Sequence, residues 1–252
     1  MLDAAARAGA AAGIAGPAAF TCAWIAGSLR QTGYPAAEIQ LSGLAAPDAR
    51  DPWIMVAGFV VLGGCTVAFG AALHDALGHA AGGRGRWRGG VGQGRWRGGA
   101  GLAPRLIQGA GLLTIAVGLL RRDRMLLTPG SVSWHNHAHD VISAVIYAAL
   151  VVAQLLLARR FGRDAADREQ ARTGWRRWRP WLLVSAGVTA GLLTAFAAGT
   201  SAADAGIMQR AAVTVPLAAI TAIAIRLTRD LARPGGTSAA GSGNTYLAAM
   251  RG

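Results

Sequence analysis

Three histidines and an aspartate cluster near the middle of the sequence, where their types and spacing could support chemistry. Ser133 can cap a helix that begins near Trp134. In such a helix His135 and His139 are four residues apart and share one face, and Asp140 follows directly. Two neutral imidazoles one turn apart, with a carboxylate beside them, can hold Zn²⁺ or a similar divalent ion.

Three interpretations of the cluster stay open. In the first, His135, His139 and Asp140 bind a metal such as zinc. In the second, the same three residues are catalytic and act as acid and base at the membrane surface. In the third, they are polar interfacial residues that hydrogen-bond to neighbouring loops. A single cluster without a second motif does not distinguish these interpretations.

Other polar residues stand near the same ends of apolar stretches and could complete a substrate-binding pocket. These are Glu38, Ser42, Asp123, Gln209 and Arg210. An arginine beside an apolar span needs a carboxylate partner, so Arg210 is expected to pair with Glu38, Asp123 or Asp140. The alternative is an ion pair that only closes this end of the molecule. The pocket, if formed, would bind a lipid headgroup, a small molecule or an ion.

The elements that must position these residues are membrane-spanning helices. The 252 residues are 53% hydrophobic and only 15% charged. A helix needs about 20 apolar residues to cross the bilayer core, and six stretches are long enough: 9–29, 53–73, 102–120, 139–158, 181–199 and 207–227. The centres of these stretches carry no Asp, Glu, Lys or Arg. The sequence therefore predicts an all-α, polytopic membrane protein with one domain, 1–230, and a disordered cytoplasmic tail, 231–252.

Small residues recur within the predicted helices at spacings that allow close backbone approach. Gly9, Gly13 and Gly16 lie in the first stretch, and Gly187 and Gly191 lie in the fifth. Both groups are candidates for helix–helix contacts.

The arginines predict the orientation. All 25 basic residues are Arg, and the net charge is +13. With the N-terminus inside, the four cytoplasmic segments and the adjoining helix ends hold one, six, eight and four Arg, whereas the outer segments hold six. Cytoplasmic loops carry the excess of basic residues, so both termini are expected in the cytoplasm, with the chain in the cytoplasmic membrane.

Two cytoplasmic segments interleave Arg with Trp. The hexapeptide GRWRGG occurs twice within 83–101, and WRRWRPW occupies 175–181. Such segments can bind nucleic acid through charge and stacking. Because these loops are tethered beside lipid, we favour anionic headgroups of membrane lipids as partners, with Trp in the interface, and expect no nucleic acid.

The sequence resembles the bacterial six-helix membrane family called domain of unknown function 998. The resemblance rests on GPAAFTCAWIAG, GYPAAEIQLSGLAAPDARDPWIMVAGFVVLG, HAHDVISAVIYAAL and GIMQR. In such proteins a Tyr-Pro turn precedes an acidic residue in the first outer loop, which here corresponds to Tyr34, Pro35 and Glu38. The family's His-Asp pair corresponds to His139 and Asp140. The resemblance implies a fold and a topology rather than an activity.

Three functions remain as hypotheses. The first is a six-helix protein whose outer rim binds a lipid headgroup, a small molecule or an ion. The second is a membrane-embedded enzyme that acts on a lipid or prenyl substrate. The third is a non-catalytic accessory subunit. The sequence has no P-loop, nucleophile elbow or CxxC motif that would favour a familiar soluble chemistry.

The Arg distribution yields a direct test of orientation. Reporters fused before Met1 and after Gly252 should both give a cytoplasmic signal, and a reporter inserted after Ala46 should give the opposite signal. A periplasmic signal from either terminus would contradict the predicted orientation.

Overall fold

The computed structural model describes residues 2–82, 101–124, 132–163, 177–198 and 204–232. Its regular elements are all helices: α1 (Leu2–Arg30), the 3₁₀ helix η1 (Leu41–Ala45), α2 (Pro52–Gly82), α4 (Leu102–Leu119), α5 (Trp134–Arg163), α6 (Trp178–Ala197) and α7 (Ala205–Ala232). Six of them are long and apolar enough to cross a membrane. The predicted all-α membrane protein with six spans is therefore confirmed. Most of the Arg/Trp loop 83–101, the start of 175–181 and the tail from 233 lie outside the described residues.

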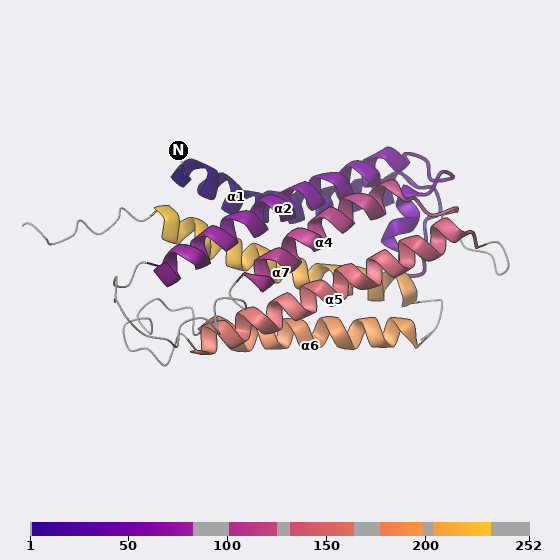
Figure 1. Ribbon diagram of the computed structural model, residues 1–252. Helices are drawn as coiled ribbons and strands as arrows, with labels where there is room; N and C mark the ends of the chain where they lie inside the picture. The colour runs from indigo at the N-terminus through magenta and orange to yellow at the C-terminus, as the bar shows by residue number, and fades with distance from the viewer. Residues whose placement is uncertain (1, 83–100, 125–131, 164–176, 199–203, 233–252) are drawn as a thin grey trace, which may run out of the picture.

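The six long helices form a closed bundle (Figure 1). Each packs against its neighbour in sequence, and α7 returns to pack against α1. The start of α1 and the end of α7 lie at the same end of the bundle, here called the terminal end, and η1 lies at the other, the η1 end. The connection 31–51 and the described residues 120–124 and 132–133 also lie at the η1 end. The sequence predicts that this end faces outward.

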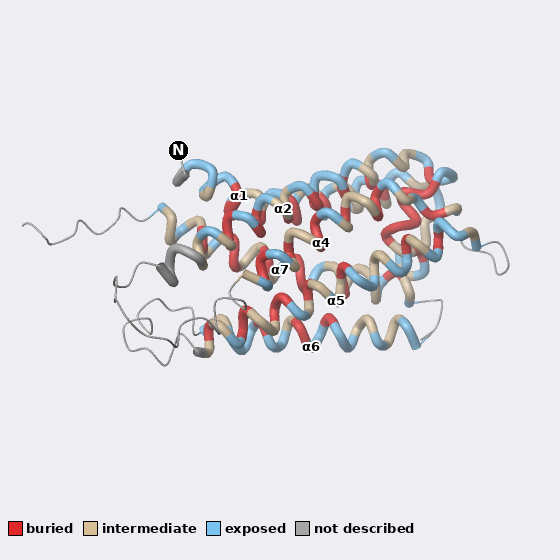
Figure 2. The backbone as a smooth tube through the Cα atoms, viewed as in Figure 1, coloured by how far each residue is buried: buried red, intermediate tan, exposed pale blue. Residues whose placement is uncertain are grey.

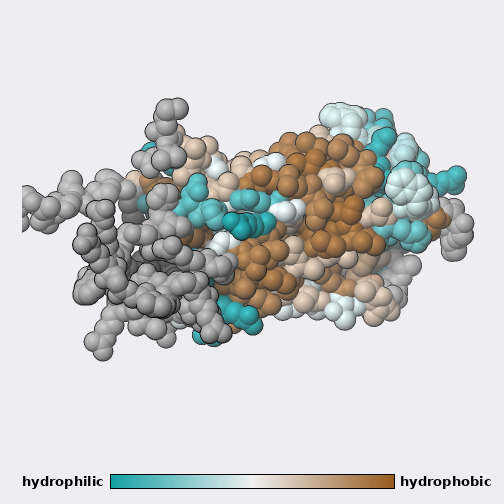
Figure 3. Space-filling model, in the orientation of Figure 1, coloured by the Kyte–Doolittle hydropathy of each residue, from teal (hydrophilic) through white to brown (hydrophobic). Residues whose placement is uncertain are grey.

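The outer surface of the bundle is that of a membrane protein. Hydrophobic side chains form a broad band across the middle of the face in Figure 3, and hydrophilic residues gather at the η1 end. Large apolar side chains that face outward include Val61, Leu112, Val145, Val152 and Val184. Apolar groups exposed at this depth require lipid rather than water around them.

The helix α6 is the most peripheral of the six (Figures 1 and 2). Only 17% of the apolar 18-residue stretch of α6 is buried inside the bundle, compared with 33–44% in the other five helices. Three residues anchor it, namely Leu182, Ala186 and Thr189, which recur every three or four positions on one face. On either side of this narrow contact α6 leaves space between itself and its neighbours.

Glycines allow the first three helices to pack at short distance. A Cβ atom added to Gly63 would lie 2.5 Å from the carbonyl oxygen of Gly111, and one added to Gly111 would lie 2.7 Å from that of Gly63. The glycine spacing of α1 also packs as expected, because a Cβ at Gly16 would lie 2.5 Å from the Cβ of Cys65. At Gly187 and Gly191 nothing lies within 4 Å, so the prediction that this pair packs against another helix is wrong within the described chain.

Several helices extend beyond the predicted apolar stretches. The largest difference is in α2, which continues from the predicted end at residue 73 to Gly82. Hydropathy marks only the part of a helix that crosses lipid, whereas the backbone stays helical into the polar region. The expected start of α5 is confirmed, since the helix begins at Trp134 and the Ser133 hydroxyl accepts a hydrogen bond from the His135 N–H at 3.2 Å.

Substitutions of two glycines in α4 should separate packing from helix propensity. Gly111→Ala places a methyl group against the α2 backbone and should destabilise the protein by about 1–3 kcal/mol. Gly109→Ala, two residues away with nothing within 4 Å, should be neutral or slightly stabilising. Thermal unfolding of both variants in detergent measures the difference, and equal midpoints would contradict close packing of α2 and α4.

Candidate functional site

A buried arginine joins three segments at the η1 end. Arg122 lies in the connection between α4 and α5, and its residue surface is 4% exposed. Its Nη1 donates to Gln40 Oε1 and to Ser42 Oγ, the latter at 3.3 Å. Its Nη2 lies 3.2 Å and 3.3 Å from the two carboxylate oxygens of Asp140 at the start of α5. Arg122 therefore ties the connection before η1, η1 itself and α5 together.

The electrostatics of Arg122 are those of a buried cation with one counterion. Burial lowers the pKa of Arg122 below its ordinary value, and the nearby carboxylates of Asp140 and Asp123 oppose this shift. Arginine nevertheless stays charged in proteins. Its Nε is buried and has no hydrogen-bond acceptor among the described residues. A buried donor without an acceptor costs about 1–3 kcal/mol, so a hydrogen-bond acceptor placed at Nε would stabilise the site.

His139 is buried beside this pair. It is 2% exposed, and its Nδ1 lies 2.8 Å from the carbonyl oxygen of Leu120. A carbonyl oxygen can only accept, so Nδ1 carries the proton and Nε2 of the neutral ring is an acceptor. The contact fixes the ring against the end of α4.

His135, by contrast, is exposed and stacks on Trp134 with ring centroids 3.8 Å apart. It shares the helical spacing of His139 but not its surroundings. Within the described parts of the chain, no three His, Cys, Asp or Glu side chains come together as a metal site. His135, His139 and Asp140 form no such group, so the metal interpretation gains no support from the described residues.

Asp123 closes the connection between α4 and α5. Its carboxylate accepts hydrogen bonds from the hydroxyl and the backbone N–H of Ser133, at 2.7 Å and 2.9 Å. These hydrogen bonds hold the pKa of Asp123 below its ordinary value. The backbone N–H of Asp123 donates to Oδ1 of Asn136 at 3.2 Å. Asp123 therefore positions the start of α5.

Arg210 fastens the first loop to α7 without a carboxylate. It donates to the carbonyl oxygens of Ala36 and Ile39, at 2.5 Å and 3.0 Å, and to the Tyr34 hydroxyl at 2.7 Å. The expectation that Arg210 pairs with Glu38, Asp123 or Asp140 is therefore wrong, because backbone carbonyls of a folded loop satisfy the guanidinium instead. The side chain of Glu38 is exposed on the same loop.

Two further contacts seat this loop on α7. Oε1 of Gln209 accepts from the Leu41 N–H at 2.5 Å, and the Ile207 N–H donates to the Ala37 carbonyl at 3.1 Å. A Cβ at Gly206 would lie within 2.4–2.7 Å of three loop carbonyls, so only glycine fits there. All five residues of η1 are buried. The helix η1 therefore closes the η1 end of the bundle as a plug.

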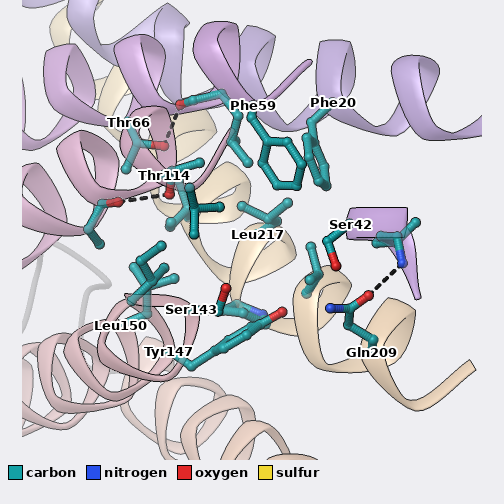
Figure 4. Close-up of a pocket in the computed structure, with 18 of the residues that line it drawn as sticks. Phe20, Ser42, Phe59, Thr66, Thr114, Ser143, Tyr147, Leu150, Gln209 and Leu217 are labelled. Atoms are coloured by element: carbon teal, nitrogen blue, oxygen red, sulfur yellow. Dashed lines mark hydrogen bonds between the residues drawn. The ribbon is translucent and has the colours of Figure 1, made fainter. Parts of the chain in front are cut away.

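A small cavity lies beneath this plug (Figure 4). It has a volume of about 70 Å³ and contains mostly apolar side chains, including Phe20 and Phe59, with Ser42 and Gln209 near η1. This volume is below the range of about 300–1,000 Å³ that is typical of small-molecule sites, and the cavity has room for water molecules.

A much larger groove lies between α5, α6 and α7 on the side of the bundle. Its volume is about 660 Å³, within the range of small-molecule sites. Gln40, Arg122, His139 and Asp140 line its polar end. Its remaining walls are mostly small or apolar: Ser143, Ala144, Tyr147, Ala148, Val151, Ala190, Leu193, Thr194, Phe196, Ala197, Gln209 and Ala212. The peripheral position of α6 leaves this groove open.

The structure brings some of the predicted site residues together and leaves others apart. His139, Asp140 and Gln209 line the groove, and Ser42 contacts Arg122 from the cavity side. The other four have separate positions: His135, Glu38, Asp123 and Arg210. Sequence reasoning missed Arg122, although the run of Arg121, Arg122 and Arg124 after an apolar stretch was a signal that such an arginine exists.

The fold defines an integral membrane protein with six candidate spans, and its lateral groove has one polar end. The family model described as "Protein of unknown function (DUF998)" matches residues 14–226. The chain therefore belongs to the DUF998 family, which confirms the resemblance found in its sequence. Comparisons with curated proteins and with solved structures give no match.

The contacts of Arg210 predict that it contributes more to stability than Arg30, another arginine at the η1 end. Arg210→Ala removes three hydrogen bonds from a charged donor, to Ala36, Ile39 and Tyr34, and should cost about 2–4 kcal/mol of stability. Arg30→Ala removes an ion pair with Asp51 in which the arginine side chain is 54% exposed, and should cost less than about 1 kcal/mol. Thermal unfolding and limited proteolysis of the loop 31–51 measure both. Equal effects would contradict the role of Arg210 as the anchor of the loop.

Proposed function

We propose that the groove between α5, α6 and α7 binds a membrane lipid, with its headgroup at Arg122 and Asp140 and its chains along the apolar walls. The observation that carries this proposal is the position of a single Arg–Asp pair at one end of a groove whose other described walls carry no fixed charge. Such a division between a polar end and apolar walls matches the division of a lipid into head and tail.

The depth of the groove supports an amphiphile rather than a soluble ligand. Asp140 lies near the start of α5 and Arg122 in the connection before it, where the bilayer interface is expected, and Tyr147, Ala148 and Val151 lie about two to three turns further into the apolar band. A headgroup bound at the pair would lie at its usual level in the bilayer. Its chains would follow α5 and α6 toward the bilayer centre.

We also infer that the η1 end faces outward and that the protein resides in the cytoplasmic membrane, in a bacterial cell. The Arg excess near the terminal end supports this orientation. The described start of α6 has the composition of an interface, with exposed Arg177 and Arg179 beside Trp181, which is 71% exposed. Anionic headgroups of the inner leaflet are the partners we propose for this end.

A lipid-acting enzyme is the second candidate. Its support is His139, whose Nδ1 contact with Leu120 leaves Nε2 as a base beside the proposed headgroup site. In this candidate His139 is the catalytic base and Asp140 with Arg122 orients the substrate. Turnover of a bound lipid by the wild type, and its loss in His139→Gln with binding retained, would favour the enzyme over the binding protein.

Blocking the groove tests the proposed lipid site. Ala148 is an exposed residue of α5 that lines the groove, and Val145, also exposed on α5, lies outside it. Ala148→Trp should fill the space between α5 and α6 and reduce the phospholipid retained per chain by about tenfold, which corresponds to about 1.4 kcal/mol. Val145→Trp should retain as much lipid as the wild type.

Native mass spectrometry of the full chain after detergent purification counts the retained phospholipids. Loss in Ala148→Trp alone supports the groove as the site. Equal retention by the wild type and both variants, or no retained lipid in any of them, would contradict the proposal.

A further inference from the structure

We infer that the lipid bound in the groove is zwitterionic and carries a primary ammonium group, as in a phosphoethanolamine headgroup. Its phosphate binds at Arg122, and its ammonium binds at Asp140. This inference rests on the proposed lipid site and deepens it by naming the class of headgroup.

The charge of the groove selects for such a headgroup. Its described lining contains one fixed cation, Arg122, and one fixed anion, Asp140. Because the pair is neutral, an anionic lipid with its phosphate at Arg122 would leave the site with a net negative charge. A cationic amphiphile bound at Asp140 would leave a net positive charge. A headgroup with both charges complements the pair, and both charges keep a partner in a medium that solvates ions poorly.

Asp140 and Arg122 differ in exposure. This difference indicates which of them binds the ammonium and which binds the phosphate of the headgroup. The Asp140 side chain is 52% exposed, so its carboxylate can accept further hydrogen bonds from an incoming ammonium. The Arg122 side chain is 5% exposed, lines the groove and contacts Asp140 through Nη2. A phosphate bound there accepts a charge-assisted hydrogen bond from the guanidinium.

The surroundings favour a primary over a quaternary ammonium. A carboxylate accepts hydrogen bonds from N–H groups, of which a primary ammonium has three and a trimethylammonium has none. Quaternary ammonium groups are usually held by several aromatic rings. The described lining of the groove contributes only Tyr147 and Phe196 as phenyl-type rings, which is fewer than the several rings of an aromatic cage.

The test uses the full chain and three phospholipids with identical acyl chains. Phosphatidylethanolamine, phosphatidylglycerol and phosphatidylcholine compete for the purified protein, and native mass spectrometry measures the bound ratio. The wild type should prefer phosphatidylethanolamine by about tenfold over each of the other two. Asp140→Asn should lose this preference and bind phosphatidylglycerol at least as well. Asp51→Asn, which removes another carboxylate from the η1 end outside the groove, should keep the wild-type ratios.

Two further measurements do not depend on the folding of a variant. Wild-type binding should weaken stepwise along the mono- and dimethylated forms of phosphatidylethanolamine, as N–H groups are lost. Glycerophosphoethanolamine, which has the headgroup without acyl chains, should not compete at equal concentration.

The outcomes distinguish the inference from the proposed function. If Ala148→Trp displaces lipid but the wild type binds all three headgroups equally, or if Asp140→Asn keeps the wild-type ratios, the headgroup assignment is wrong and the lipid site remains. Equal binding along the methylated series would also overturn the assignment. If Ala148→Trp displaces no lipid, or if glycerophosphoethanolamine competes as well as the intact lipid, the lipid site itself is wrong.

Discussion

The burial of one guanidinium at the edge of the membrane is the constraint on which the η1 end of this protein depends. A cation out of water must be paired and hydrogen-bonded, or it costs several kcal/mol. Arg122 meets this requirement by binding Gln40, Ser42 and Asp140, which belong to three different segments. These contacts hold η1 over the small cavity and also hold the start of α5. They place the Arg122–Asp140 ion pair at the polar end of the groove between α5, α6 and α7.

The packing of the helices explains why the groove lies where it does. The contacts among α1, α2 and α4 rely on glycines such as Gly63 and Gly111, whose missing side chains let backbones touch. The helix α6 has glycines too, but Gly187 and Gly191 have nothing within 4 Å. Close packing on one side of the bundle and loose packing at α6 leave a stable wall beside an open space. The charged pair at α5 lies at the edge between these two regions.

Much of the fold could be predicted from the sequence because lipid imposes strong rules. Six apolar stretches of the required length predicted six helices, and Ser133 marked the start of α5 correctly. The contacts of individual polar side chains were harder to predict. His135 and His139 have the spacing of a shared face, but His135 is exposed and stacks on Trp134, whereas His139 is buried against the end of α4. Arg210 was expected to need a carboxylate, yet the carbonyls of the loop 34–39 satisfy it. Loop folding, which has no periodicity, decides such contacts. Loop folding also decides which arginine in the run of Arg121, Arg122 and Arg124 becomes buried, and the sequence does not show this.

A structure of the full chain in nanodiscs that contain phosphatidylethanolamine would test the central claim most directly. The account predicts an elongated lipid between α5 and α6, with a phosphate oxygen within hydrogen-bond distance of the Arg122 guanidinium and the amine beside Asp140. The result that would contradict it is a groove closed by direct packing of α6 against Tyr147 and Ala148, with Arg122 and Asp140 paired only to each other and to protein.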